Sequence, residues 1–514
     1  MKGRTVSAQE KSSSLDRGTL IACCLAVAIA QMCITIPSPI NGEITAAFGA
    51  SGGQVAWVTS AFILPTAILE LNFGVVGDMF GRKRLLVLGA VVLAAGELIN
   101  STAQGIEWMW LGQAVAGVGA AALFPSSLAL IAAATPDTRD RAKALSRWAL
   151  SISLASAAGP LMSGGIATAV EFRWVFVPLV VFGLIVAAVC ARWVTDSKAP
   201  EGRSLDWPGQ ITIAIALTAL LWGVIQGGDQ GWGRTEIIAA LVVAVVALAG
   251  FVVAELRSAS PMMNLSLLRI PSFAAAAIVA LVGMAGFIGT AYCVSIRLGA
   301  VMHLSALDAG MPFVILQIVP LLLAGVLSKL LSQANPRWLL LGGLLPMAAG
   351  QFWLAALPIT TTSLVAFLGP VLLLGVGFIF VVSSLTAAAV NAVPVRLTGM
   401  ASGATSLVRE FGQALGPAVI SSVAMGAASS ALVGKLSGPG AAVEAAGGPL
   451  AVVNVPNVGQ AAQDAARDAL AHGLSLGMVI CGCASLAAAL ITMVLVRPDS
   501  SHQESGVEAE PAAA

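Results

Sequence analysis

The chain has 514 residues, and 58% of them are hydrophobic even before its 54 glycines are counted, whereas only 10% are charged. Soluble domains are roughly 45–50% apolar and about 25% charged, so the composition excludes a soluble globular protein. The net charge of +1 indicates neither a nucleic-acid partner nor a polybasic protein of the membrane surface. Long uninterrupted apolar runs also exclude a transmembrane β-barrel, whose strands alternate over short segments.

The apolar runs predict an all-α polytopic membrane protein with fourteen spans. A spanning helix needs about 20 predominantly apolar residues, and the runs end at polar, glycine or proline positions. The first run follows basic residues, as in a signal peptide, but it has full span length and no clear cleavage motif, so we interpret it as a span. The predicted spans are 19–40, 54–76, 85–103, 108–131, 145–168, 173–195, 208–227, 237–254, 273–296, 309–330, 338–357, 363–390, 402–427 and 474–496.

Orientation follows from the basic residues, because short cytoplasmic loops of membrane proteins carry an excess of Lys and Arg. With the N-terminus inside, most of the 26 basic residues fall in cytoplasmic loops. The sequence therefore predicts a multi-pass protein of the inner (plasma) membrane, with both termini cytoplasmic and the lipid bilayer around it.

Neither a metal, a cofactor nor catalysis is expected. The seven cysteines lie in apolar stretches with no His or carboxylate at ligand spacing, which favours small buried hydrophobic side chains over disulfides or metal ligands. No nucleophile, base and metal ligands occur together in a recognisable pattern, so we predict that the protein is not an enzyme.

The most specific motif lies in the predicted cytoplasmic loop between the second and third spans. A carboxylate near the end of one helix, glycines that permit a tight turn, and a basic cluster at the start of the next helix predict a charged link between two helix ends. A loop that is merely basic explains the cluster but not the carboxylate and the glycines. The predicted gating residues are Gly74, Asp78, Gly81, Arg82, Lys83 and Arg84.

This loop resembles the G-x-L-x-D-R-x-G-R-[RK] signature of the major facilitator superfamily, with Val76 at the Leu position and Met79 at the first Arg position. Residues 172–176 and 206–209 resemble landmarks of its fourteen-span drug/proton antiporter branch. The resemblance implies two six-helix bundles around a central cavity, with two further helices between them. The implied parts are a cytoplasmic N-terminus (1–18), a first bundle (19–195), a linker (196–207), two inserted helices (208–254), a linker (255–272), a second bundle (273–496) and a cytoplasmic tail (497–514).

The second bundle contains one long predicted external loop, residues 428–473, which is rich in Ala, Gly and Pro. Within it, residues 460–471 are either a short amphipathic helix or disordered.

The fifth span carries a stripe of small residues that permits close approach of a neighbouring helix. It resembles the superfamily's antiporter motif G-P-x-x-G-G, with Ser163 at the first of the paired glycines. The resemblance implies a hinge, whereas ordinary tight packing is the alternative reading. The predicted hinge residues are Gly159, Pro160, Gly164 and Gly165.

Ionisable residues inside the predicted spans are the candidates for proton coupling, because a charge at membrane depth is costly unless it faces a cavity or a partner. Arg409 and Glu410 lie in the thirteenth span, in a context that resembles the antiporters' R-Q-x-G-x-x-x-G pattern with Glu410 at the Gln position. We predict Glu410 as the main protonation site, and a purely structural Arg–Glu pair is the alternative. Glu70 and Glu97 rank below it, since both are also explained as residues at the membrane interface.

Four side chains are candidates for lining a substrate cavity: Arg409, Arg297, Asp308 and Gln113. Arg297 would meet an anionic substrate group or pair with Asp308, although helix capping is the simpler explanation of Asp308. Gln113 occupies the position of the Arg in the R-x-x-Q-G motif of the family's fourth span.

The resemblance implies export of hydrophobic drugs or antibiotics by alternating access, with protons and a small hydrophobic substrate as partners and no nucleic acid. Two alternatives stay open. One is a dedicated exporter of a single endogenous metabolite, and the other is a transporter that is not coupled to protons. The second alternative follows from Gln113 and from a first span that lacks the branch's usual Asp.

Overall fold

The computed structural model describes residues 17–135, 137–198, 205–258, 261, 263, 265–333, 335–361, 363–393, 398–455 and 457–496. The predicted terminal segments and parts of both linkers therefore lie largely outside the described residues. All regular elements within these ranges are helices. Among them, fourteen are long and apolar enough to cross a membrane, which confirms the predicted fold class.

The first bundle begins with a helix that is interrupted by a proline and then continues in a second segment. Its elements are α1 (Arg17–Thr35), α2 (Pro37–Phe48), α3 (Gly52–Phe80), α4 (Arg82–Ser101), α5 (Ile106–Ala134), α6 (Thr138–Ala169), η1 (Phe172–Val175) and α7 (Val177–Trp193). Two inserted helices follow, α8 (Trp207–Gln230) and α9 (Thr235–Arg257).

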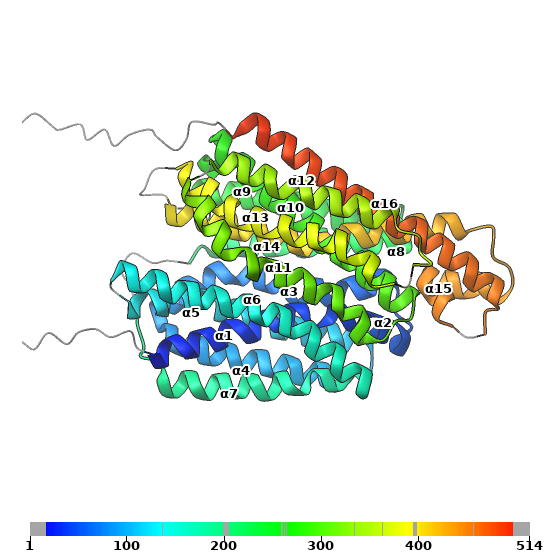
Figure 1. The fold of residues 1–514 in the computed structure, drawn as a ribbon, viewed down its shortest axis with the longest axis horizontal. Helices are drawn as coiled ribbons and strands as arrows, with labels where there is room; N and C mark the ends of the chain where they lie inside the picture. The colour runs from blue at the N-terminus through cyan, green and yellow to red at the C-terminus, as the bar shows by residue number, and fades with distance from the viewer. Residues whose placement is uncertain are drawn as a thin grey trace, which may run out of the picture.

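The second bundle has six long helices and three shorter elements. These are η2 (Leu265–Arg269), α10 (Pro271–Ser295), the π-helical segment η3 (Ile296–Val301), α11 (Ala306–Gln333), α12 (Pro336–Ala356), α13 (Val365–Asn391), α14 (Thr398–Leu432), α15 (Pro439–Asn454) and α16 (Gln460–Leu495). Figure 1 shows the two bundles lying one above the other with their helices roughly parallel.

The helical stack has two ends that carry different elements. The termini face is the end where α1 begins and α16 finishes, and the α15 face is the opposite end, where α2 and α15 lie (Figure 1).

Two predicted boundaries differ from the structure. The first span, predicted as 19–40, is broken at Ile36 because Pro37 has no amide hydrogen with which to continue the ladder. The segment 428–473 is largely helical rather than a long loop, since α14 extends to Leu432, α15 fills the middle and α16 begins at Gln460. Residues 460–471, for which helix and disorder were both open, form the first turns of α16.

Small residues bring helices of the first bundle into backbone contact. A Cβ added at Gly96 of α4 would lie 2.3 Å from the amide nitrogen of Ala116 on α5, and one at Gly119 would lie 2.5 Å from the amide nitrogen of Leu93. Membrane helices associate through such close packing, because hydrocarbon supplies no hydrophobic drive between them.

Close backbone contact at glycine residues also joins the two bundles near the α15 face. A Cβ at Gly42 of α2 would lie 2.5 Å from the carbonyl carbon of Gly299 in η3, and one at Gly164 of α6 would lie 2.8 Å from the carbonyl oxygen of Ala306. The hydroxyl of Thr168 also accepts a hydrogen bond from the amide of Leu307 at 3.1 Å. These contacts close the α15 face in this conformation.

We expect Gly42→Ala to open the α15 face, because its methyl group would overlap the Gly299 backbone although alanine favours the helix itself. A cysteine placed at Thr59, which lines the space between the bundles, then reacts faster with a membrane-impermeant maleimide added from that side. Gly165→Ala is the matched control, since a Cβ there meets no atom within 4 Å. Equal labelling in the two variants would show that the Gly42–Gly299 contact does not hold this face closed.

Candidate functional site

A cavity lies between the bundles, at the level where α1 passes into α2. Its volume is about 50 Å³, whereas pockets for drug-sized ligands have roughly 300–1,000 Å³. The bundles must therefore move apart before the cavity admits such a ligand. Both bundles contribute to its wall: Ile34, Thr35, Ser38, Asn41, Thr59, Ile63 and Pro160 from the first, and Phe287, Ile288, Ala291, Tyr292, Phe313, Leu316, Gln317 and Pro417 from the second.

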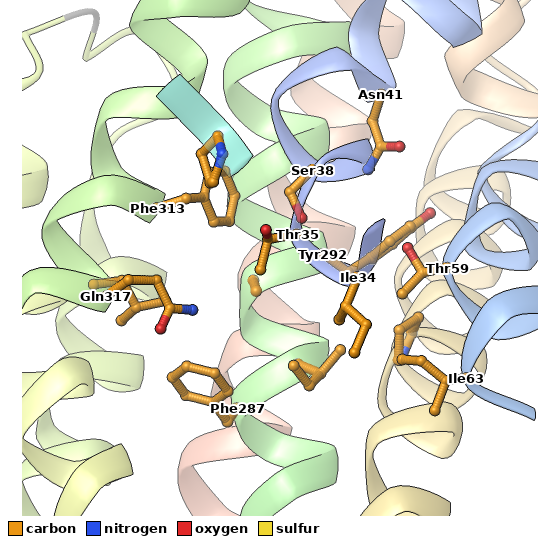
Figure 2. Close-up of a pocket in the computed structure, with 15 residues that line it drawn as sticks. Ile34, Thr35, Ser38, Asn41, Thr59, Ile63, Phe287, Tyr292, Phe313 and Gln317 are labelled. Carbon is orange, nitrogen blue, oxygen red and sulfur yellow. The ribbon is translucent and has the colours of Figure 1, made fainter. Parts of the chain in front are cut away.

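The cavity wall combines aromatic and aliphatic surface with uncharged hydrogen-bonding groups. Figure 2 shows Phe313 and Gln317 on one side and Thr59 and Ile63 on the other, with Thr35 between them. Apolar walls with a few placed polar groups are typical of small-molecule sites. None of the wall residues was predicted from the sequence to line a cavity, because only the packing of the two bundles brings them together.

A charged cluster is formed where α3 of the first bundle meets α14 of the second. Arg409 donates from Nη2 to Oε1 of Glu410 at 3.0 Å and from Nε at 3.3 Å. Glu70 of α3 lies within electrostatic range of both side chains. We call Glu70, Arg409 and Glu410 the charged cluster. The structure thus brings together the main predicted protonation site and a secondary one, although 340 positions separate them in the sequence.

The charged cluster lies toward the termini face from the cavity wall. Glu70 follows Ile63 by seven residues along α3, and Glu410 precedes Pro417 by seven along α14. Seven helical residues rise about 10 Å. Next to the wall residues Thr59 and Ile63, the bundles contact each other through the hydroxyl of Ser60, which donates to the carbonyl oxygen of Ala414 at 3.3 Å.

Glu97 is not part of this cluster but lies inside the first bundle. It is fully buried on α4, and its Oε2 accepts a hydrogen bond from Nδ2 of Asn100 at 3.2 Å. Asn100 in turn packs against Gly112 of α5, where a Cβ would lie 2.1 Å from its Oδ1. Gln113, next to Gly112, is 1% exposed, and its Oε1 has no hydrogen-bond partner among the described residues.

Arg297 does not face the cavity or reach Asp308. It is 2% exposed, donates from Nη1 to the carbonyl oxygen of Leu357 at 3.0 Å, and lies with its guanidinium 5.2 Å from the Phe367 ring centroid. A cation at the last carbonyls of a helix, here α12, satisfies acceptors that the helix leaves free. Its position supports a structural role in the second bundle.

Asp308 lies in the first turn of α11, which is capped by Ser305. Its amide donates to the hydroxyl of Ser305 at 3.2 Å, and that hydroxyl lies 2.7 Å from its carboxylate. This geometry matches the capping explanation.

The predicted gating loop connects four parts of the first bundle. Arg82 donates to Asp78 at 2.7 Å, and its Nη1 donates to the hydroxyl of Ser197 after α7 at 3.1 Å and to the carbonyl oxygen of Ala129 of α5 at 3.4 Å. The amide of Lys83 donates to Asp196 at 3.0 Å. The link between helix ends is therefore broader than the sequence predicted. Arg84 is exposed, and Gly74 lies inside α3.

The four predicted hinge residues lie on α6, where it crosses α1 and α11. A Cβ at Gly159 would lie 2.2 Å from the hydroxyl oxygen of Thr35, and the carbonyl oxygen of Pro160 lies 3.2 Å from the Cβ position of Gly310. Gly159 and Gly164 are thus contact points, whereas Gly165 faces open space.

The described residues contain no group of three or more His, Cys, Asp or Glu side chains that could hold a metal ion. The fold is that of a membrane protein with two helical bundles around a cavity. The sequence profile of the Major Facilitator Superfamily matches residues 23–417, and the chain belongs to this family.

Two curated relatives and one solved structure illustrate the likeness. The chain is 28% identical to the multidrug resistance protein Stp of Mycobacterium tuberculosis over 79% of this chain and 75% of that one. It is 29% identical to the multidrug efflux pump LfrA of Mycolicibacterium smegmatis over 92% and 94%. A bacterial homologue of the human lysosomal transporter Spinster, solved in an inward-facing, unoccupied conformation, has a TM-score of 0.63 at 16% identity, with 94% and 97% covered.

We expect Gly81→Ala to lower the free energy of unfolding by about 1–3 kcal/mol. Gly81 has a φ of 118°, and a Cβ there would lie 2.7 Å from the carboxylate of Asp196. Gly74→Ala is the matched control in α3, the helix that leads into this loop: its Cβ meets only Pro125 at 3.8 Å, so helix propensity makes it neutral or stabilising. Thermal unfolding in detergent measures the stability of both variants. An unchanged unfolding midpoint for Gly81→Ala would contradict the inference that position 81 requires glycine.

Proposed function

We propose that the protein exports small hydrophobic compounds, such as drugs or antibiotics, in exchange for protons. The names of the relatives Stp and LfrA support multidrug efflux. In this proposal the protein lies in the plasma membrane with the termini face in the cytoplasm, as the distribution of basic residues predicts. The closed α15 face is then the external side.

The charged cluster carries the proposal. With both carboxylates ionised, Glu70, Arg409 and Glu410 bear a net charge of −1, and one bound proton makes the cluster neutral. Such groups are costly in a membrane unless they are paired. Because the cluster lies between α3 and α14, a proton changes the attraction between the two bundles.

Alternating access follows from this coupling. A proton bound from outside changes how strongly Arg409 and Glu410 of α14 interact with Glu70 of α3, and proton loss to the cytoplasm reverses that change. The bundles then rock about the cavity, with the Asp78–Arg82 pair holding the ends of α3 and α4 together during the motion. Gly159 and Pro160 form the contact about which α6 moves against α1.

We expect Glu410→Gln to abolish proton-driven efflux, because a neutral amide still fits the site but cannot exchange a proton. In everted membrane vesicles with an acidic lumen, the rate of drug-dependent proton release falls at least tenfold. Glu70→Gln gives a smaller loss, since Glu70 is the secondary site. Glu107→Gln, an exposed carboxylate in the first turn of α5, is the control that stays at the wild-type rate.

The outcomes separate the parts of this proposal. Efflux that persists when the pH gradient is collapsed would establish the uncoupled alternative. Gradient-dependent efflux that survives in Glu410→Gln would move the coupling site elsewhere, with Glu97 as the next residue to substitute. A resistance profile restricted to one compound would identify a dedicated exporter instead of a multidrug pump.

A further inference from the structure

A chain of hydrogen bonds crosses from one bundle to the other at the cavity wall. The hydroxyl of Ser295 on α10 donates to the carbonyl oxygen of Ser38 on α2. The same hydroxyl oxygen accepts from Nδ2 of Asn41 at 2.9 Å. A hydroxyl has a single hydrogen, so Ser295 has no further proton to give, and the nitrogen of the Asn41 amide must face it.

This arrangement fixes the orientation of the Asn41 amide and leaves its oxygen free. Asn41 is 2% exposed, and its Oδ1 has no hydrogen-bond partner among the described residues. Asn41 also belongs to the cavity wall (Figure 2). A buried acceptor without a partner costs free energy that a bound donor recovers, so the site favours a ligand with an O–H or N–H group.

The other wall residues indicate the chemical character of the remainder of the ligand. Phe287 and Phe313 supply aromatic surface, and Thr35 and Gln317 add uncharged polar groups. None of the described wall residues carries a formal charge at neutral pH. Glu70 and Glu410 lie toward the termini face and are not among the residues that line the cavity.

We propose that the cargo is an uncharged aromatic compound with a hydrogen-bond donor, and that Oδ1 of Asn41 accepts a hydrogen bond from this donor. This inference rests on the proposed efflux function and specifies its substrate class. Asn41 also bonds to Ser295 across the two bundles, so a donor on its Oδ1 binds where the closed α15 face is held together. Cargo recognition and closure of that face thus share one side chain.

The probes are N-phenyl-1-naphthylamine, a neutral aromatic amine with one N–H, its N-methyl derivative, which has none, and ethidium, a permanent cation. Binding to the purified full chain is measured through quenching of its tryptophan fluorescence. The loss of one hydrogen bond corresponds to a change of about three- to tenfold in Kd. We expect the N–H amine to bind that much tighter than its N-methyl derivative, and ethidium to bind weakest.

Two variants test the role of Asn41. Asn41→Leu removes the acceptor at similar size, so the two naphthylamines bind equally well. Asn41→Asp places a carboxylate in the wall and shifts the preference toward ethidium at least tenfold. Asn454→Leu and Asn454→Asp are matched controls, because Asn454 contacts the carbonyl oxygens of Ala300 and Leu450 outside the cavity; both keep the wild-type order.

Binding and proton exchange are read separately, which distinguishes the two proposals. Ethidium binding as tight as that of the N–H amine, or equal binding of the two naphthylamines to the wild type, would overturn the assignment of cargo class. A ratio of naphthylamine affinities that stays at the wild-type value in Asn41→Leu would overturn it as well. Wild-type binding in the expected order without any probe-dependent proton movement in proteoliposomes would overturn proton exchange and leave the cargo class standing.

Discussion

A charged or polar group inside a membrane protein has no water to solvate it, so a partner must be within reach. The described charges follow this constraint in three ways. Arg297 is satisfied by the last carbonyls of α12, Arg82 by Asp78 and the segment after α7, and Arg409 by the carboxylate of Glu410. The first two partnerships lie within one bundle and stabilise it. The third also lies within one bundle, on α14, but it interacts with Glu70 of the other bundle, so movement of the bundles changes its surroundings.

Close packing at glycine residues is the second constraint. It operates in a different region of the molecule from the charged cluster. Gly42 and Gly164 bring the bundles to backbone distance near the α15 face, whereas the charged cluster lies toward the termini face. The cavity lies between these two regions. The bundles therefore meet through close backbone packing at one end and through ionisable side chains nearer the other, and this division suits the proposed alternating access.

The uncharged cavity wall gives the proposed exchange an electrical consequence. A neutral cargo leaves without moving charge, so each proton that enters carries one net positive charge inward. The membrane potential then drives transport together with the pH gradient. In the two proposals, the Asn41 amide recognises the cargo and the charged cluster binds the proton.

The sequence by itself determined the fourteen spans and the acidic candidates, because apolar length and the cost of buried charge are local properties. It also determined the family through the 74–84 loop. Only the tertiary structure decided that Glu70 meets Arg409 and Glu410, that Arg297 serves α12, and that Asn41 faces the cavity with a free oxygen. These facts depend on which helix faces contact one another across the bundles, and the pattern of apolar residues is nearly uniform around each span and does not encode that choice.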